Sequence, residues 1–179
     1  MDSVRKAHIA NFAEKLRNGL NLNSPVDLQL VVSKLGGRLE EFREEFGGEA
    51  EAYVRKTGDS FAIATRYEGA PKVRERFSIA HEIGHLFVHL GYKVDPELWN
   101  SIDEGYLDSV KHRLGYNQEE FEANEFAASL LMPKDEFVKV AKLNLNGQEF
   151  DLDKIADHFG VSRQAAKVRG QWLGIFSWR

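Results

Sequence analysis

The stretch RERFSIAHEIGHLFVHL, residues 74–90, decides how the rest of the chain must be arranged. Its apolar side chains recur at helical spacing and are interrupted only by Gly84, which predicts a largely buried helix. The order His-Glu-x-x-His places His81 and His85 one turn apart and about 40° apart around the helix axis. Both imidazoles can therefore bind one metal ion. Glu82 lies about 100° from His81, where it can reach a water molecule on that ion and act as a base.

The same three residues also have an interpretation without a metal, as hydrogen-bonded residues of the core. A pattern of three fixed letters arises by chance in about 2% of chains of this length, a risk that every short motif carries. Three ionisable groups in an otherwise apolar helix are nevertheless costly to bury without partners, and a divalent cation supplies a partner for all three. The metal interpretation is therefore the stronger one.

Length and composition limit the class of protein. The 179 residues suit one domain, spanning 1–179, with a substantial core. With 28 acidic and 24 basic residues, the formal charge of -4 gives no overall support for binding to nucleic acid or membranes. The chain has no cysteine, so nitrogen and oxygen atoms must hold any metal. It shows no signal peptide and no membrane-spanning stretch, and we expect a cytoplasmic protein.

The order of helical and strand patterns predicts an α+β fold, a mostly helical single domain with a small three-stranded antiparallel sheet. The second helix has the clearest boundaries, with Ser24 as N-cap and Gly36-Gly37 as stop. Residues 92–115 are polar and weakly periodic and are expected to form a rim loop. The expected parts are, in chain order, N-terminal helices (1–36), the sheet (37–68), the metal-motif helix (71–90), a second strong helix (117–132) and a helix-turn-helix-like tail (151–173).

A catalytic zinc usually has three protein ligands and one open position, so a third donor must come from elsewhere in the fold. The metzincin pattern is excluded, because Val88 and Gly91 occupy the positions of its glycine and third histidine. His89 lies about 12 Å along the helix axis from His81, so we interpret it as a residue that supports the ligands or the fold. The remaining candidates are four glutamates of the second strong helix, Glu119, Glu120, Glu122 and Glu125.

Two motifs together, RERFSIAHEIGHLFVH and EFEANEFAASLLMP, resemble the ImmA/IrrE family of metallopeptidases. These are phage- and mobile-element-associated proteases that cleave helix-turn-helix repressors. The resemblance implies that His81 and His85 bind Zn²⁺, that Glu82 is the catalytic base, and that Glu122, in the family's E-A-N-x-F-A block, is the third ligand. The position of Glu122 around its helix is consistent with this role, because the apolar Phe126 follows it by four residues and marks the buried side. Glu125 occupies the unspecified position of the block and is the weaker candidate.

The implied function is zinc-dependent hydrolysis of peptide bonds, with a helix-turn-helix repressor as the protein substrate. Zinc would activate a water molecule and polarise the scissile carbonyl, while Glu82 would move the proton from that water to the leaving amine. A further donor must stabilise the oxyanion. Four residues on or near the rim loop are candidates that the sequence does not rank, Tyr92, Tyr106, His112 and Tyr116.

Two other functions stay open. The first is a catalytically silent metal-binding regulatory or partner-docking protein, but a pure binding site has no need of a base at Glu82. The second is a DNA-binding regulator that uses the tail, where Arg163, Lys167 and Arg169 give the last helix a positive face. The acidic residues before that helix and the acidic chain as a whole disfavour nucleic acid as a partner. We expect no membrane partner.

Overall fold

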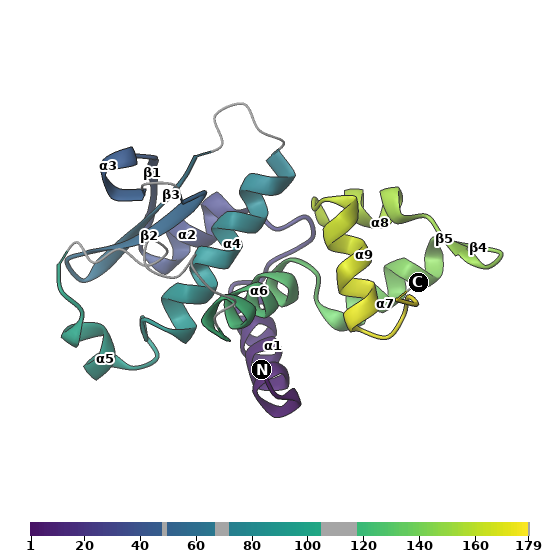
Figure 1. Ribbon diagram of the computed structural model, residues 1–179, viewed down its shortest axis with the longest axis horizontal. Coiled ribbons are helices and arrows are strands. Elements are labelled where there is room, and N and C mark those ends of the chain that lie inside the picture. The colour runs from purple at the N-terminus through teal and green to yellow at the C-terminus, as the bar shows by residue number, and fades with distance from the viewer. Residues whose placement is uncertain (48–49, 67–71, 105–117, 179) are drawn as a thin grey trace.

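A computed structural model of the protein describes residues 1–47, 50–66, 72–104 and 118–178 (Figure 1). The mostly helical α+β fold predicted from the sequence is confirmed. Helix α4, Lys72–Val88, carries the metal motif and runs through the middle of the molecule (Figure 1). It packs against the sheet on one side and against helix α6, Gln118–Leu131, on another. The rest of the fold holds these two helices together.

The N-terminal region contains helices α1, Ser3–Gly19, and α2, Leu28–Leu35. Helix α2 ends as predicted, at Gly36 in the left-handed conformation with φ 91°. Its predicted start at Ser24 is wrong. Asp27 is the N-cap instead, because its carboxylate accepts a hydrogen bond from the backbone N–H of Leu30 at 3.0 Å.

The small sheet is mixed rather than antiparallel. Strands β2, Ala52–Thr57, and β3, Ser60–Thr65, form the antiparallel hairpin that the sequence predicts. Strand β1, Arg38–Glu41, is followed by the short helix α3, Glu44–Gly47, and pairs in parallel with β3, giving the order β1-β3-β2. The four buried residues 61–64 of β3 explain this order, because a strand covered on both faces belongs at the centre of a sheet.

The C-terminal region forms the predicted helix-turn-helix. Its turn contains Gly160 with φ 62°, and Ser162 caps the last helix by accepting a hydrogen bond from the N–H of Ala165 at 3.1 Å. Of the expected rim loop, residues 105–115 lie outside the described residues. The remaining elements are α5 (Pro96–Ser101), α7 (Lys134–Leu143), β4 (Leu145–Asn146), β5 (Glu149–Phe150), α8 (Leu152–Phe159) and α9 (Arg163–Trp172).

Two buried arginines hold the C-terminal end of α6. Arg17 of α1 donates to the carbonyl oxygen of Leu130 at 3.1 Å, and Arg169 of α9 donates to the carbonyl oxygen of Met132 at 3.0 Å. The last carbonyls of a helix have no partner within the helix and interact favourably with positive charge. Helices α1 and α9 therefore fix the position of α6.

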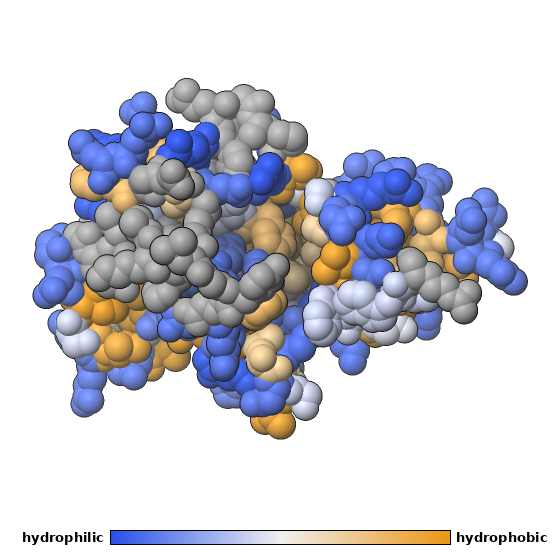
Figure 2. Space-filling view, in the orientation of Figure 1, coloured by the Kyte–Doolittle hydropathy of each residue, from blue (hydrophilic) through white to orange (hydrophobic). Residues whose placement is uncertain are grey.

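The core and the surface follow the expected division of apolar and polar residues. One cluster of buried apolar side chains extends from Ile9 in α1 to Ala166 in α9. Hydrophilic residues dominate the surface over α8 and the β4–β5 hairpin, whereas apolar surface appears over α5, where Leu98 is 39% exposed (Figure 2). In the part of the chain that the structure describes, no helix is both long and apolar enough to cross a membrane.

Helices α4 and α6 approach each other closely at Gly84. A methyl group at this position would lie 3.0 Å from both the Cα and the carbonyl oxygen of Ala123 and 3.2 Å from the Cβ of Phe126. These distances are shorter than ordinary van der Waals contacts, and two of the three atoms belong to the backbone of α6. The absence of a side chain at Gly84 therefore sets the distance between the two helices.

We expect Gly84→Ala to lower the free energy of unfolding by about 1–3 kcal/mol, because the added methyl group forces α6 away from α4. Gly19→Ala is the matched control, since Gly19 is also helical and has no atom within 4 Å of an added methyl group. Urea unfolding of both variants measures the difference. Equal stabilities for the Gly84→Ala variant and the parent would show that the two helices are not in close contact.

Candidate metal centre

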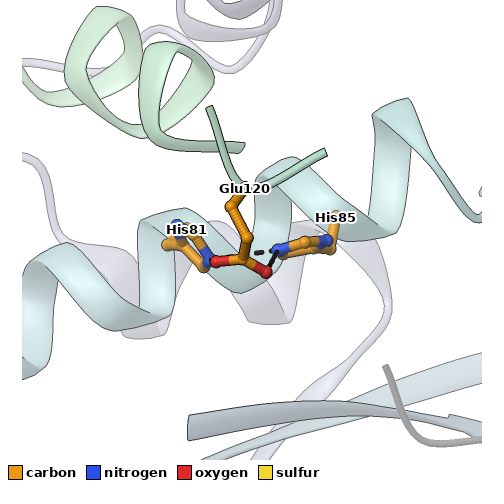
Figure 3. Close-up of side chains that lie close together, drawn as sticks. All are labelled: His81, His85 and Glu120. Atoms are coloured by element: carbon orange, nitrogen blue, oxygen red, sulfur yellow. Dashed lines mark hydrogen bonds and ion pairs between the residues drawn. The ribbon is translucent and has the colours of Figure 1, made fainter. Parts of the chain in front are cut away.

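His81 and His85 lie on the same face of α4, as their spacing predicts. The side chain of His81 is 15% exposed and that of His85 is fully buried. Their Nε2 atoms are 3.0 Å apart and point toward the same place (Figure 3). Two imidazole nitrogens are thus available to one ligand.

The third group at this place is the carboxylate of Glu120, which reaches down from α6 between the two rings (Figure 3). One of its oxygens lies 3.3 Å from His81 Nε2, and the other lies 3.3 Å from His85 Nε2. Hydrogen bonds with His81 and then His85 hold the pKa of Glu120 far below its usual value, although burial acts in the opposite direction. The group is therefore an ionised carboxylate at neutral pH.

The donor set and its dimensions fit a zinc ion. Bonds of about 2.0–2.2 Å to a tetrahedral zinc would place its ligand atoms about 3.3–3.6 Å apart, a little more than the observed separations of 3.0 and 3.3 Å, so a small outward movement would admit the ion. Two histidine nitrogens and one carboxylate oxygen are also a known ligand set for catalytic zinc. Among the described residues, His81, His85 and Glu120 form the one cluster of this kind that could hold a metal ion.

The far sides of both rings are hydrogen-bonded in a way that suits metal binding. His81 Nδ1 lies 3.0 Å from the side-chain oxygen of Asn124, and His85 Nδ1 lies 3.0 Å from His89 Nδ1. When each Nδ1 donates its proton outward, each Nε2 keeps a free electron pair for the metal. Asn124 follows Glu120 by one helical turn, so α6 supplies both a carboxylate and a supporting amide.

Glu82 is buried beside this cluster, with 3% of the residue exposed. A cavity of about 270 Å³ opens between α4, α6 and the start of β2, and Glu82, His81, Glu120 and Asn124 are among the residues that line it. The cavity has room for several water molecules, each of which occupies about 30 Å³ in the liquid. A carboxylate in this position can exchange a proton with a molecule held beside the two histidines.

Glu122, the expected third ligand, is buried but is not placed with His81 and His85. Its carboxylate accepts hydrogen bonds from Arg5 at 2.6 Å and Gln118 at 2.8 Å and lies 3.4 Å from His89 Nε2. Burial alone would raise the pKa of Glu122, but the hydrogen bonds from Arg5 and Gln118 lower it to about 2. The buried side of α6 faces α1 as well as α4, and helical phase alone does not separate these two neighbours.

The other candidates from the sequence are placed elsewhere. Glu125 forms an ion pair with Arg169 at 2.9 Å. Tyr92 donates a hydrogen bond to the carbonyl oxygen of Leu35 at 2.8 Å in the core, and is not among the residues that line the cavity. The remaining three candidates for the oxyanion, Tyr106, His112 and Tyr116, lie outside the described residues.

Glu120 was one of four candidate glutamates in the sequence, whereas Asn124 was not identified as a site residue. The sequence feature that could have identified Asn124 is its spacing of four residues from Glu120. On a helix this spacing places a carboxylate and an amide on one face, as it does for the two histidines.

Residues 42–170 match the family Peptidase_M78, described as an IrrE N-terminal-like domain. The chain belongs to this family. The match confirms the resemblance to ImmA/IrrE proteins, and it leaves α1, α2 and β1 outside the matched region of the Peptidase_M78 family. None of the curated proteins compared with the chain matches it significantly.

A solved structure of a Mycobacterium tuberculosis transcriptional regulator resembles the chain, with a TM-score of 0.57 and 17% sequence identity. The likeness covers 91% of this chain but only 46% of the regulator. At this level of identity the likeness concerns the fold alone. This member of the Peptidase_M78 family thus spans less than half the length of that regulator.

We expect Glu120→Ala to weaken binding of Zn²⁺ by more than about 100-fold, because the loss of a ligand exceeds the 10- to 100-fold loss typical of supporting residues. Glu122→Ala should weaken zinc binding by about 10- to 100-fold, because Glu122 contacts His89, which contacts His85. Glu119→Ala, on the same turn as Glu120, is the matched control and should bind Zn²⁺ like the parent. Competition with a chromogenic chelator gives the three dissociation constants. A larger loss for Glu122→Ala than for Glu120→Ala would restore the ligand assignment implied by the sequence.

Proposed function

We propose that the chain is a zinc-dependent peptidase in which His81, His85 and Glu120 hold the metal. The observation that carries the proposal is the convergence of two imidazole nitrogens and one carboxylate, 3.0–3.3 Å apart, beside a buried glutamate in a cavity. Membership of a peptidase family supports it. Glu120 takes the place that the resemblance gave to Glu122.

The proposed chemistry is attack of water on a peptide carbonyl. A bound zinc ion would polarise that carbonyl and lower the pKa of a water molecule. Glu82 accepts the proton of the attacking water and gives it to the leaving amine, as a general base and then a general acid. Asn124 keeps the His81 ring oriented by accepting its Nδ1 proton at 3.0 Å.

The proposed substrate is a regulatory protein in the cytoplasm, and specifically a helix-turn-helix repressor. The resemblance to repressor-cleaving proteases of the ImmA/IrrE family supports this choice. The alternative that the chain itself binds DNA through α9 is weaker than its sequence suggested. Arg169 is buried and paired with Glu125, and Arg163 lies 3.4 Å from Asp153, so two of the three expected basic residues already have acidic partners.

We expect Glu82→Gln to slow cleavage of a helix-turn-helix repressor substrate by at least about 100-fold, because a general base contributes about 10²–10⁴ to the rate. Zinc affinity should stay close to that of the parent, since the amide fills the same space. Glu75→Gln, on the same helix and hydrogen-bonded to Thr65, is the control. Gel analysis of timed digests measures the rates. A Glu82→Gln variant that cleaves as fast as the parent would remove Glu82 from the mechanism.

Metal should also stabilise the fold. Zinc at about 100 times its dissociation constant should raise the free energy of unfolding by about 2.7 kcal/mol, because it binds the folded state alone. His85→Ala should show no such gain. Urea unfolding of both proteins, with zinc and with excess chelator, measures the effect. A gain of the same size in the His85→Ala variant would place the bound zinc at another site.

A further inference from the structure

A chain of hydrogen bonds leads from the second metal-facing histidine to the N-terminal helix. His85 Nδ1 lies 3.0 Å from His89 Nδ1, and His89 Nε2 lies 3.4 Å from a carboxylate oxygen of Glu122. The same oxygen accepts a hydrogen bond from the guanidinium of Arg5 in α1 at 2.6 Å. His85, His89 and Glu122 have side chains that are 0%, 11% and 4% exposed. The proposed reaction uses none of these contacts directly.

The protons along this chain can be assigned from its far end. An ionised carboxylate such as Glu122 accepts hydrogen bonds and cannot donate, so Nε2 of His89 must carry the proton between them. A neutral His89 then has an electron pair on Nδ1 and accepts the Nδ1 proton of His85. When zinc occupies the site, His85 thereby keeps its proton on Nδ1 and an electron pair on Nε2, the atom that faces His81 and Glu120. The opposite tautomer of His85 would place a hydrogen where the metal must bind.

We propose that His89 and Glu122 are positioning residues that fix the orientation and tautomer of His85 for metal binding, and that Arg5 anchors them to α1. The inference rests on the proposed function, because it concerns a ligand of the proposed zinc site. It gives a role to Glu122, which the sequence singled out as a ligand. It also gives a role to His89, whose distance from His81 along the helix axis excluded it from the ligand set.

Arg5 has a specific task in this arrangement. A buried carboxylate without a compensating charge is strongly destabilising, and Glu122 is 4% exposed. Arg5 supplies the charge and Gln118 a further hydrogen bond, so the carboxylate can remain ionised in the interior. Helix α1 lies outside the region matched by the family. A segment that precedes the peptidase region therefore reaches the metal centre through one side chain.

The first test compares two substitutions of His89. His89→Phe keeps the ring but removes both hydrogen bonds, and should weaken zinc binding about 10- to 100-fold, the cost of losing a residue that supports a ligand. His89→Gln offers an oxygen to accept from His85 and an amide to donate to Glu122, and should bind zinc nearly as tightly as the parent. Equal binding by the Phe variant and the parent, or equal losses in both variants, would overturn the proposal.

The second test concerns the anchor. Arg5→Met removes the charge and should raise the zinc dissociation constant several-fold. Lys6→Met is the matched control, because Lys6 is the next residue of α1 but contacts Glu125 and the ring of Trp172 instead. Lys6→Met should leave zinc binding unchanged. If the Arg5 and Lys6 variants bind zinc equally, α1 has no part in positioning His85.

A measurement on the zinc-loaded parent decides the tautomer without any variant. Two-bond ¹H–¹⁵N correlation spectra should show His85 protonated on Nδ1 and His89 protonated on Nε2. A His85 ring protonated on Nε2 would contradict the proposal even if every variant folds poorly. If the parent binds no zinc at all, the proposed function fails, whereas a proton on His89 Nε2 in the metal-free spectra still tests the contact between His89 and Glu122.

Discussion

The contact between α4 and α6 is the constraint on which the site depends. Neither helix contains the complete cluster, since α4 supplies His81 and His85 and α6 supplies Glu120. A small displacement of α6 would separate the carboxylate from the two rings, which it approaches to 3.3 Å. The close approach at Gly84 and the arginine contacts at the C-terminal end of α6 both act against such a displacement.

The glutamates of α6 illustrate how one helix serves several neighbours. Glu122 and Glu125 follow Glu120 by two and five residues, which places them about 200° and 140° away around the axis. Each carboxylate therefore contacts a different element. Glu120 contacts the histidines of α4, Glu122 contacts Arg5 of α1, and Glu125 contacts Arg169 of α9. We therefore propose that Glu120 binds the metal and Glu122 positions His85, while Glu125 pairs with Arg169 of α9.

The sequence predicted the parts of the fold that depend on local pattern. The two histidines one turn apart, the stop at Gly36 and the helix-turn-helix tail all follow from spacing and capping, and the structure contains them. The choice between Glu120 and Glu122 did not follow, because local pattern does not fix the rotation of α6 about its own axis. That choice depends on how α1 packs against α6, a contact between residues more than 100 positions apart. The parallel pairing of β1 with β3 is a long-range property of the same kind.

The central claim is that one zinc ion is held by His81, His85 and Glu120. The most direct measurement is a crystal structure of the zinc-loaded protein, with anomalous diffraction at the zinc edge to locate the metal. We predict one strong anomalous peak at about 2.0–2.2 Å from Nε2 of both histidines and from a carboxylate oxygen of Glu120. A peak bonded to the carboxylate of Glu122, or one away from the two histidines, would contradict the claim.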